Sequence, residues 1–116
     1  MSLPRLTVAT CQFPVTADVK ANSANIRRQI KMAAIQGADV AHFPEFAISS
    51  NGYADRKSGD WKTAWRRRNW TEIRAETETI RQVCRDHGLW AVVGSSHSFD
   101  ERERPTNCVY IFNGSG

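Results

Sequence analysis

Apolar and polar residues follow two different patterns along this chain, and together they predict four strands and two helices. Short, nearly continuous apolar runs predict strands at residues 6–12, 40–43, 89–94 and 107–112. Apolar residues recur at helical spacing in two longer segments, which predicts amphipathic helices over about 22–36 and 71–87. The order strand, helix, strand, helix, strand, strand predicts an α/β domain with a layered sheet.

The expected ends of both helices carry typical capping residues. Asn22 or Ser23 is expected to begin the first helix, and Gly37 to end it. Gly88 is the predicted stop of the second helix. The first strand, residues 6–12, is apolar almost throughout, and we therefore expect it to be buried on both faces.

Composition and charge are those of an ordinary globular domain. Hydrophobic residues make up 41% of the chain and charged residues 24%, which argues against wholesale disorder. The net charge of +4 is a weak signal for nucleic acid, because 12 acidic residues are mixed among 16 basic ones. No apolar run approaches the roughly 18 residues that span a bilayer, so no membrane partner is expected.

The three cysteines lie in apolar segments rather than in loops. This odd number makes a disulfide framework a poor explanation, and we expect a reducing cytoplasm. Cys11, Cys84 and Cys108 are each predicted to be core residues rather than nucleophiles.

One carboxylate stands in a position that suits catalysis. Pro44 ends the apolar run 40–43, because proline cannot donate to a sheet ladder. Glu45 follows at once and is therefore expected at the carboxyl end of a strand, where open α/β sheets place their ligand sites. Such a residue could act as a catalytic acid or base, or it could be a solvated carboxylate after a strand end.

Several motifs, taken in order, resemble the amino-terminal part of the nitrilase, or carbon-nitrogen hydrolase, superfamily. The resemblance covers nearly the whole chain, and it is the ordered set rather than any single piece that is specific. The matching pieces are Val8-Ala9-Thr10-Cys11-Gln12, Asn22 through Asn25-Ile26, Gly37-Ala38-Asp39-Val40, Phe43-Pro44-Glu45, Gly52-Tyr53, His87-Gly88-Leu89, Val92-Val93-Gly94-Ser95 and residues 107–112.

The resemblance implies a four-layer αββα sandwich and a catalytic triad of glutamate, lysine and cysteine. Glu45 matches the glutamate, while the positions of the lysine and the cysteine fall beyond Gly116. Residues 1–116 are therefore expected to be a single partial domain, truncated at its carboxyl end and inactive alone. The implied substrate is a small amide, a carbamoyl compound or a nitrile, with no cofactor. Tyr53 is a candidate for substrate binding, or else caps the core with its hydroxyl in water.

The three histidines do not have the spacing of a zinc site, so no metal is expected. His87 is most simply a cation near a helix end. His42 is closer to the candidate chemistry, because it precedes Glu45 in the same strand segment. Side-chain alternation allows it to lie beside Glu45 or to point away.

A non-catalytic binding or assembly module is the alternative to a hydrolase. Residues 47–69 have no clear period, and so long a loop is usually functional. Aromatic and basic residues alternate between Trp61 and Trp70, a combination that can hold an anion or a nucleic acid strand. The other interpretation, which we favour, is that the tryptophans pack down while the arginines stay in water. Nucleic acid is therefore not expected as a partner.

A sheet that is cut short exposes a strand edge and an apolar face. We therefore expect the chain to form a homo-oligomer or to pair with a complementary chain.

Overall fold

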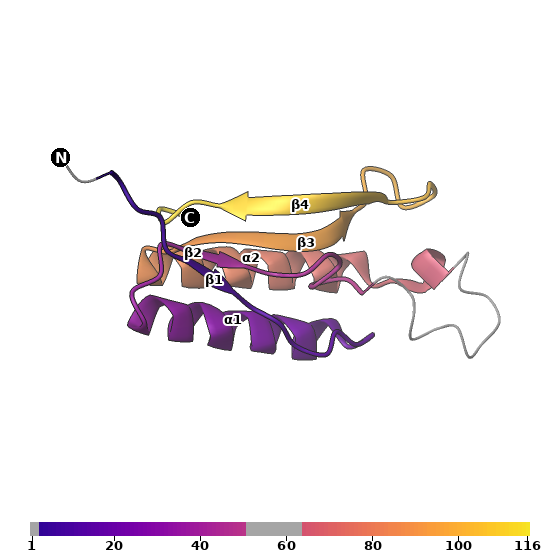
Figure 1. Ribbon diagram of the computed structural model, residues 1–116. Helices are drawn as coiled ribbons and strands as arrows, with labels where there is room; N and C mark the ends of the chain where they lie inside the picture. The colour runs from indigo at the N-terminus through magenta and orange to yellow at the C-terminus, as the bar shows by residue number, and fades with distance from the viewer. Residues whose placement is uncertain (1–2, 51–63) are drawn as a thin grey trace.

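The computed structural model describes residues 3–50 and 64–116. It shows a four-stranded sheet and two long helices (Figure 1). The predicted α/β class and the predicted order of strands and helices are confirmed. The elements are β1 (Val8–Thr10), α1 (Val19–Ile35), β2 (Val40–His42), the 3-10 helix η2 (Ala64–Arg67), α2 (Trp70–His87), β3 (Trp90–His97) and β4 (Thr106–Phe112).

The strands lie in the sheet in their chain order, β1-β2-β3-β4. The first three are parallel, and β4 runs antiparallel to β3. Parallel neighbours need a crossover, which α1 supplies between β1 and β2 and α2 supplies between β2 and β3. The carboxyl ends of β1, β2 and β3 therefore meet at one edge of the sheet, and the chain leaves β2 toward Pro44 and Glu45 at that edge.

Helix α1 begins earlier than predicted, and its cap is a different residue. Asp18 is the N-cap, and its carboxylate accepts a hydrogen bond of 3.0 Å from the backbone N–H of Ala21. Asn22 and Ser23, the predicted caps, lie within the helix and are buried.

The prediction of an Asn22 cap was wrong because the Asn22 amide bonds to other parts of the chain. Its Oδ1 accepts from the Thr16 N–H at 2.9 Å, and its Nδ2 donates to the Thr16 carbonyl at 2.7 Å and to the Ile48 carbonyl at 3.1 Å. With only 1% of its surface exposed, Asn22 ties the segment before α1 to the turn after β2.

The other helix ends agree with the sequence patterns. Asn69 caps α2 by accepting from the Glu72 N–H at 3.0 Å, and the helix begins at Trp70, one residue before the predicted start. Gly37 and Gly88 follow the two helices with positive φ angles of 80° and 60°, the conformation that favours glycine. Neither helix, in the parts of the chain that the structure describes, has the length and apolar character needed to cross a membrane.

The core lies on one face of the sheet, between the strands and both helices (Figure 1). Ile26 and Ile30 of α1 and Ile73, Ile80 and Cys84 of α2 are at most 2% exposed. They are the apolar stripes that the helical spacing predicts. The buried strand residues beneath them include Ala41, Ala91 and Val93.

The opposite face of the sheet is open and apolar. Val8 is 48% exposed, Trp90 50%, Val109 59% and Ile111 65%. The register places Val8 opposite Val40 and Val40 opposite Trp90, so Val8, Val40 and Trp90 form a row across β1, β2 and β3. The prediction that the first strand is buried on both faces was wrong, because the helices cover only one side and no described element covers the other.

Candidate active site

Glu45 lies in the turn that follows β2, at the edge where the parallel strands end. This segment, residues 43–50, is called the Glu45 turn. It lines a cavity of about 360 Å³ together with His42, Phe43, Pro44, Val92, Gly94, Asn107 and Val109. The cavity walls come from β2, β3, β4 and the turn after β2, and Glu45 itself is exposed. The sequence-predicted carboxylate therefore occupies a pocket built by three strands.

The turn carrying Glu45 packs directly on the backbone of β3 at Gly94. A Cβ atom on Gly94 would lie 2.4 Å from the Pro44 carbonyl oxygen and 2.6 Å from the Glu45 Cα. No side chain fits in that space, so only glycine allows this approach. The Ile48 N–H also donates to the Gly94 carbonyl at 3.2 Å, which holds the far side of the turn on the same residue.

Two residues of this turn adopt an uncommon backbone conformation. Phe46 has a φ of 57° and Ser50 a φ of 63°, in the left-handed region that non-glycine residues seldom enter. Each such residue costs of the order of 1–3 kcal/mol unless its surroundings hold it. The Ser50 N–H donates to the Phe46 carbonyl at 2.9 Å, which closes the turn on itself.

A hydrogen-bonded network holds the end of the turn. Arg68 donates through Nη2 to the Ser50 carbonyl at 2.8 Å and through Nη1 to the Ser96 hydroxyl at 2.9 Å. The Ser49 hydroxyl lies 3.1 Å from the same Ser96 hydroxyl, and Asn22 holds the Ile48 carbonyl from the other side. The turn is thus fixed to β3, to α1 and to the segment before α2.

The carboxylate of Glu45 is held by one side chain. Asn107, near the start of β4, donates through Nδ2 to the Glu45 Oε1 at 2.6 Å. Among the described residues no second side chain or backbone group bonds to this carboxylate, so Oε2 has no hydrogen-bond partner there. A carboxylate fixed by one oxygen can accept a proton on the other.

His42 lies on the Glu45 side of its strand, because both residues line the same cavity. His87 is in the last turn of α2, as predicted, while His97 bonds to the Tyr110 hydroxyl at 2.6 Å through Nδ1. Within residues 3–50 and 64–116, no three histidine, cysteine or acidic side chains gather as metal ligands would.

The three cysteines do not line the Glu45 cavity. Cys11 and Cys84 are buried as predicted, but the prediction of a core position was wrong for Cys108, which lies on the edge strand β4 and is only half-buried. Burial raises the pKa of Cys84 to about 11 and also raises those of Cys11 and Cys108. A nucleophilic thiol needs a lowered pKa, so these environments suit structural cysteines.

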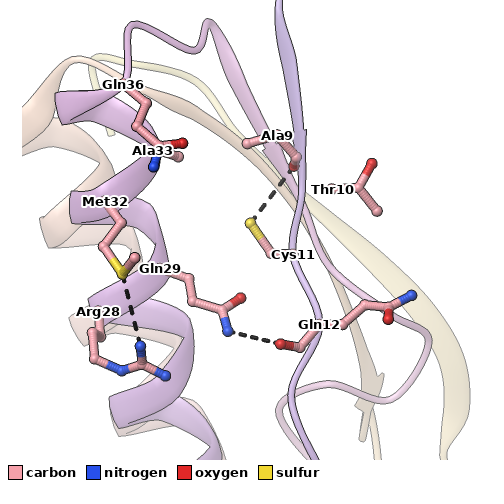
Figure 2. A pocket seen from close by; sticks show the side chains of 9 residues that line it. All are labelled: Ala9, Thr10, Cys11, Gln12, Arg28, Gln29, Met32, Ala33 and Gln36. Carbon is pink, nitrogen blue, oxygen red and sulfur yellow. Dashed lines mark hydrogen bonds between the residues drawn. The ribbon is translucent and has the colours of Figure 1, made fainter.

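A second cavity, of about 250 Å³, lies between β1 and α1 (Figure 2). Figure 2 shows the Cys11 thiol turned toward the Ala9 carbonyl, 3.6 Å away, and the Gln29 amide donating to the Gln12 carbonyl at 2.8 Å. No carboxylate or histidine lines this cavity. It therefore lacks a base for the Cys11 thiol, and the Glu45 cavity is the better candidate.

Two predictions fall wholly or partly outside the described residues. Tyr53 lies in the undescribed range, as do residues 61–63 of the aromatic and basic segment between Trp61 and Trp70. In the described part of that segment, Trp70 is 5% exposed and belongs to the core. Arg68 bonds to the Glu45 turn, and the Arg66 guanidinium lies 5.4 Å from the Trp65 ring centre. Trp70 therefore packs as the favoured interpretation expects, whereas Arg68 does not stay in water but bonds to the protein.

The supporting residues Asn107, Arg68 and Gly94 were not predicted from the sequence as parts of the site. Asn107 and Gly94 were recognised only as positions in strands, and Arg68 only as a cation in an aromatic segment. Their roles depend on contacts between residues far apart in the chain, such as the 62 positions that separate Asn107 from Glu45.

Comparison with known proteins agrees with this architecture. The sequence profile of the carbon-nitrogen hydrolase family matches residues 7–116. An amidase from Nesterenkonia sp. superposes with a TM-score of 0.75 at 16% identity, over 95% of this chain and 39% of that chain. A variant of the amidase from Nesterenkonia sp. AN1, with acrylamide added at its active-site cysteine, has a TM-score of 0.77 at 17% identity, over 96% and 41%.

The C. elegans NitFhit protein has a TM-score of 0.70 at 20% identity, over 99% of this chain and 26% of that chain. At these identities the solved structures show a shared fold, and this chain spans about 40% of the length of the amidases. No curated protein matches the sequence significantly. The family profile nevertheless covers almost every residue, and the predicted resemblance is confirmed: the chain belongs to the carbon-nitrogen hydrolase family.

Proposed function

We propose that residues 1–116 are the amino-terminal part of a carbon-nitrogen hydrolase domain and that Glu45 is its general base. The observation that carries this proposal is the placement of Glu45. The residue follows the carboxyl end of β2 and lines a cavity of about 360 Å³, and its carboxylate is bonded through Oε1 to Asn107. Family membership supports hydrolysis of a carbon-nitrogen bond as the reaction.

In the proposed mechanism, Glu45 takes the proton from a cysteine thiol, and the thiolate attacks the carbonyl carbon of the substrate. A lysine ammonium stabilises the negative charge that develops on the substrate oxygen. The carbon-nitrogen bond then breaks, and Glu45 returns its proton to the departing ammonia. Water, activated by the same carboxylate, hydrolyses the acyl-enzyme. The lysine and the cysteine would come from residues after Gly116, as the family resemblance implies.

A small amide is the substrate class that we favour over a carbamoyl compound or a nitrile. Variants of the amidase from Nesterenkonia sp. AN1, which has the same fold, have been solved in complex with acrylamide and with butyramide. In this chain Phe43, Pro44, Val92 and Val109 give the Glu45 cavity apolar walls, which suit a short uncharged acyl group. Tyr53, three residues beyond the end of the Glu45 turn, is proposed to contact the substrate.

We further propose that the open face of the sheet is covered by the residues after Gly116 in the complete domain, and by a second copy or a complementary chain when residues 1–116 stand alone. The exposed apolar residues Val8, Trp90, Val109 and Ile111 support this, because so much apolar surface is rarely left in water. The three free cysteines support the cytoplasm as its location. The proposed reaction needs no cofactor.

Ammonia release by the protein expressed from its complete reading frame tests the proposed function. Butyramide, butyronitrile and a carbamoylated amine would be compared at equal concentrations, with residues 1–116 alone as a parallel sample. We expect ammonia from butyramide with the complete protein and none with residues 1–116 alone.

Two outcomes would contradict the proposal. Hydrolase function would be contradicted if the complete protein released ammonia from none of the three compounds. Efficient release by residues 1–116 alone, lost in Glu45→Gln, would show that the catalytic groups are already complete in this segment.

A further inference from the structure

We propose that Asn107 is a positioning residue for Glu45, fixing which carboxylate oxygen receives the proton. This inference rests on the proposed function of Glu45 as a base. The place of Asn107 in the site depends on the pairing of β3 with β4. Asn107 lies opposite Ser96 in that pairing, and Val109, two residues further on, lies opposite Gly94.

The register brings Asn107 to the same face of the sheet as the Glu45 turn. Side chains two positions apart in a strand share a face, so Asn107 and Val109 point in the same direction. Both line the Glu45 cavity. Gly94 sets the backbone of the turn against β3, and Asn107 reaches across from β4 to the carboxylate. Strand β3 therefore positions the backbone of Glu45, and strand β4 positions its carboxylate.

The two side chains are within hydrogen-bond distance. The Asn107 Nδ2 lies 2.6 Å from the Glu45 Oε1, and the acceptor is an ionised carboxylate, which makes the bond stronger than one between neutral groups. The glutamate side chain has three rotatable bonds, and it would otherwise sample several orientations in water. A single donor that holds Oε1 leaves Oε2 as the oxygen that meets the thiol proton.

The role of Asn107 is separable from a role in folding. Its side chain is exposed, and its backbone pairs with Ser96 whatever side chain the residue carries. Leucine and aspartate have nearly the same shape as asparagine. Leucine has no donor, and aspartate presents a second negative charge to Glu45, so the three residues separate size, hydrogen bonding and charge.

The test is a kinetic series in the protein expressed from its complete reading frame, with butyramide as substrate. We expect Asn107→Leu to lower kcat by about 10- to 100-fold with KM unchanged, because a misplaced catalytic group slows the chemical step. Asn107→Asp should lower kcat at least as far, and Asn107→Gln, which keeps the amide donor, should recover part of the loss. Asn113→Asp is the matched control, since Asn113 bonds to the Ser115 N–H and not to Glu45.

A second measurement does not depend on activity. In nuclear magnetic resonance spectra of the complete protein, the Asn107 side-chain amide signal is expected to shift in Glu45→Gln, while that of Asn113 stays in place. An unshifted Asn107 signal, or Asn107→Leu with kcat within twofold of the wild type, would overturn the inference. A different outcome would count against the proposed function alone. If the complete wild-type protein released no ammonia but the Asn107 amide signal still shifted in Glu45→Gln, the hydrogen bond between the two side chains would be supported and the hydrolase function would not.

Discussion

Replacing Glu45 by glutamine in the complete protein is expected to lower kcat for amide hydrolysis by about a thousandfold, within the range found for general acid-base groups. Glutamine has the size of glutamate, and its Oε1 can still accept the hydrogen bond from Asn107. It cannot take a proton from a thiol at neutral pH. The fold and the cavity should therefore persist while the reaction fails, which ammonia release and thermal unfolding together would show.

Glu101→Gln is the matched control for this substitution. Glu101 is a surface carboxylate, 3.0 Å from the Arg74 guanidinium, and its side chain is 58% exposed. Surface ion pairs contribute about 0–1 kcal/mol, so this variant should keep both stability and activity near those of the wild type. If Glu45→Gln retained more than a tenth of the wild-type kcat, Glu45 would not be the base.

Replacing Gly94 by alanine is the second change for which we expect a large effect. The added Cβ would come within 2.4 Å of the Pro44 carbonyl oxygen and 2.7 Å of the Phe46 nitrogen, so the turn must move away from β3. A displacement of about 1 Å at a catalytic group can lower the rate about 100-fold. The forced contact should also lower the free energy of unfolding by about 1–3 kcal/mol. Both effects can be measured in the complete protein, by ammonia release and by urea unfolding.

Gly88→Ala separates displacement of the site from loss of stability. Gly88 has a φ of 60° and no atom within 4 Å of an added Cβ, so alanine there is strained without any clash. We expect a stability loss of about 1–2 kcal/mol, the cost of placing a residue with a Cβ in the left-handed region, with kcat unchanged. If Gly94→Ala had no more effect on kcat than Gly88→Ala, the close packing at Gly94 would not be what positions Glu45.

Periodicity predicts most of the secondary structure of this chain. The stripe of Ile26 and Ile30, the stop at Gly88 and the strand end before Pro44 all follow from local preferences, and the structure confirms them. Asn22 shows where that reasoning fails. Its side chain suits a helix cap equally well, but a buried amide forms its hydrogen bonds wherever partners are available, and here they lie in two loops.

Burial is harder to predict than the presence of a strand. The apolar run around Val8 is compatible with a strand covered on both faces, and the sequence of the run does not show what covers the second face. In the structure Val8 and Trp90 lie in one exposed row on the open face. Covering that face requires further protein, which local pattern cannot identify.

The candidate site was predicted in part. Glu45 was identified from the proline before it and from the family resemblance, because both signals are local in the sequence. Asn107 could not be, because an asparagine near the start of a strand has many possible roles. Only the register of β3 with β4 brings its amide to the carboxylate.

The most direct test of this account is the position of Glu45 in a crystal structure of the protein expressed from its complete reading frame. We predict a cysteine Sγ from residues after Gly116 within hydrogen-bond reach of the Glu45 Oε2, at about 3 Å or somewhat more in an unliganded site. A lysine from the same region should lie on the other side of the cavity. A Glu45 carboxylate that faces solvent with no cysteine near it, or a reading frame that ends at Gly116, would contradict the account.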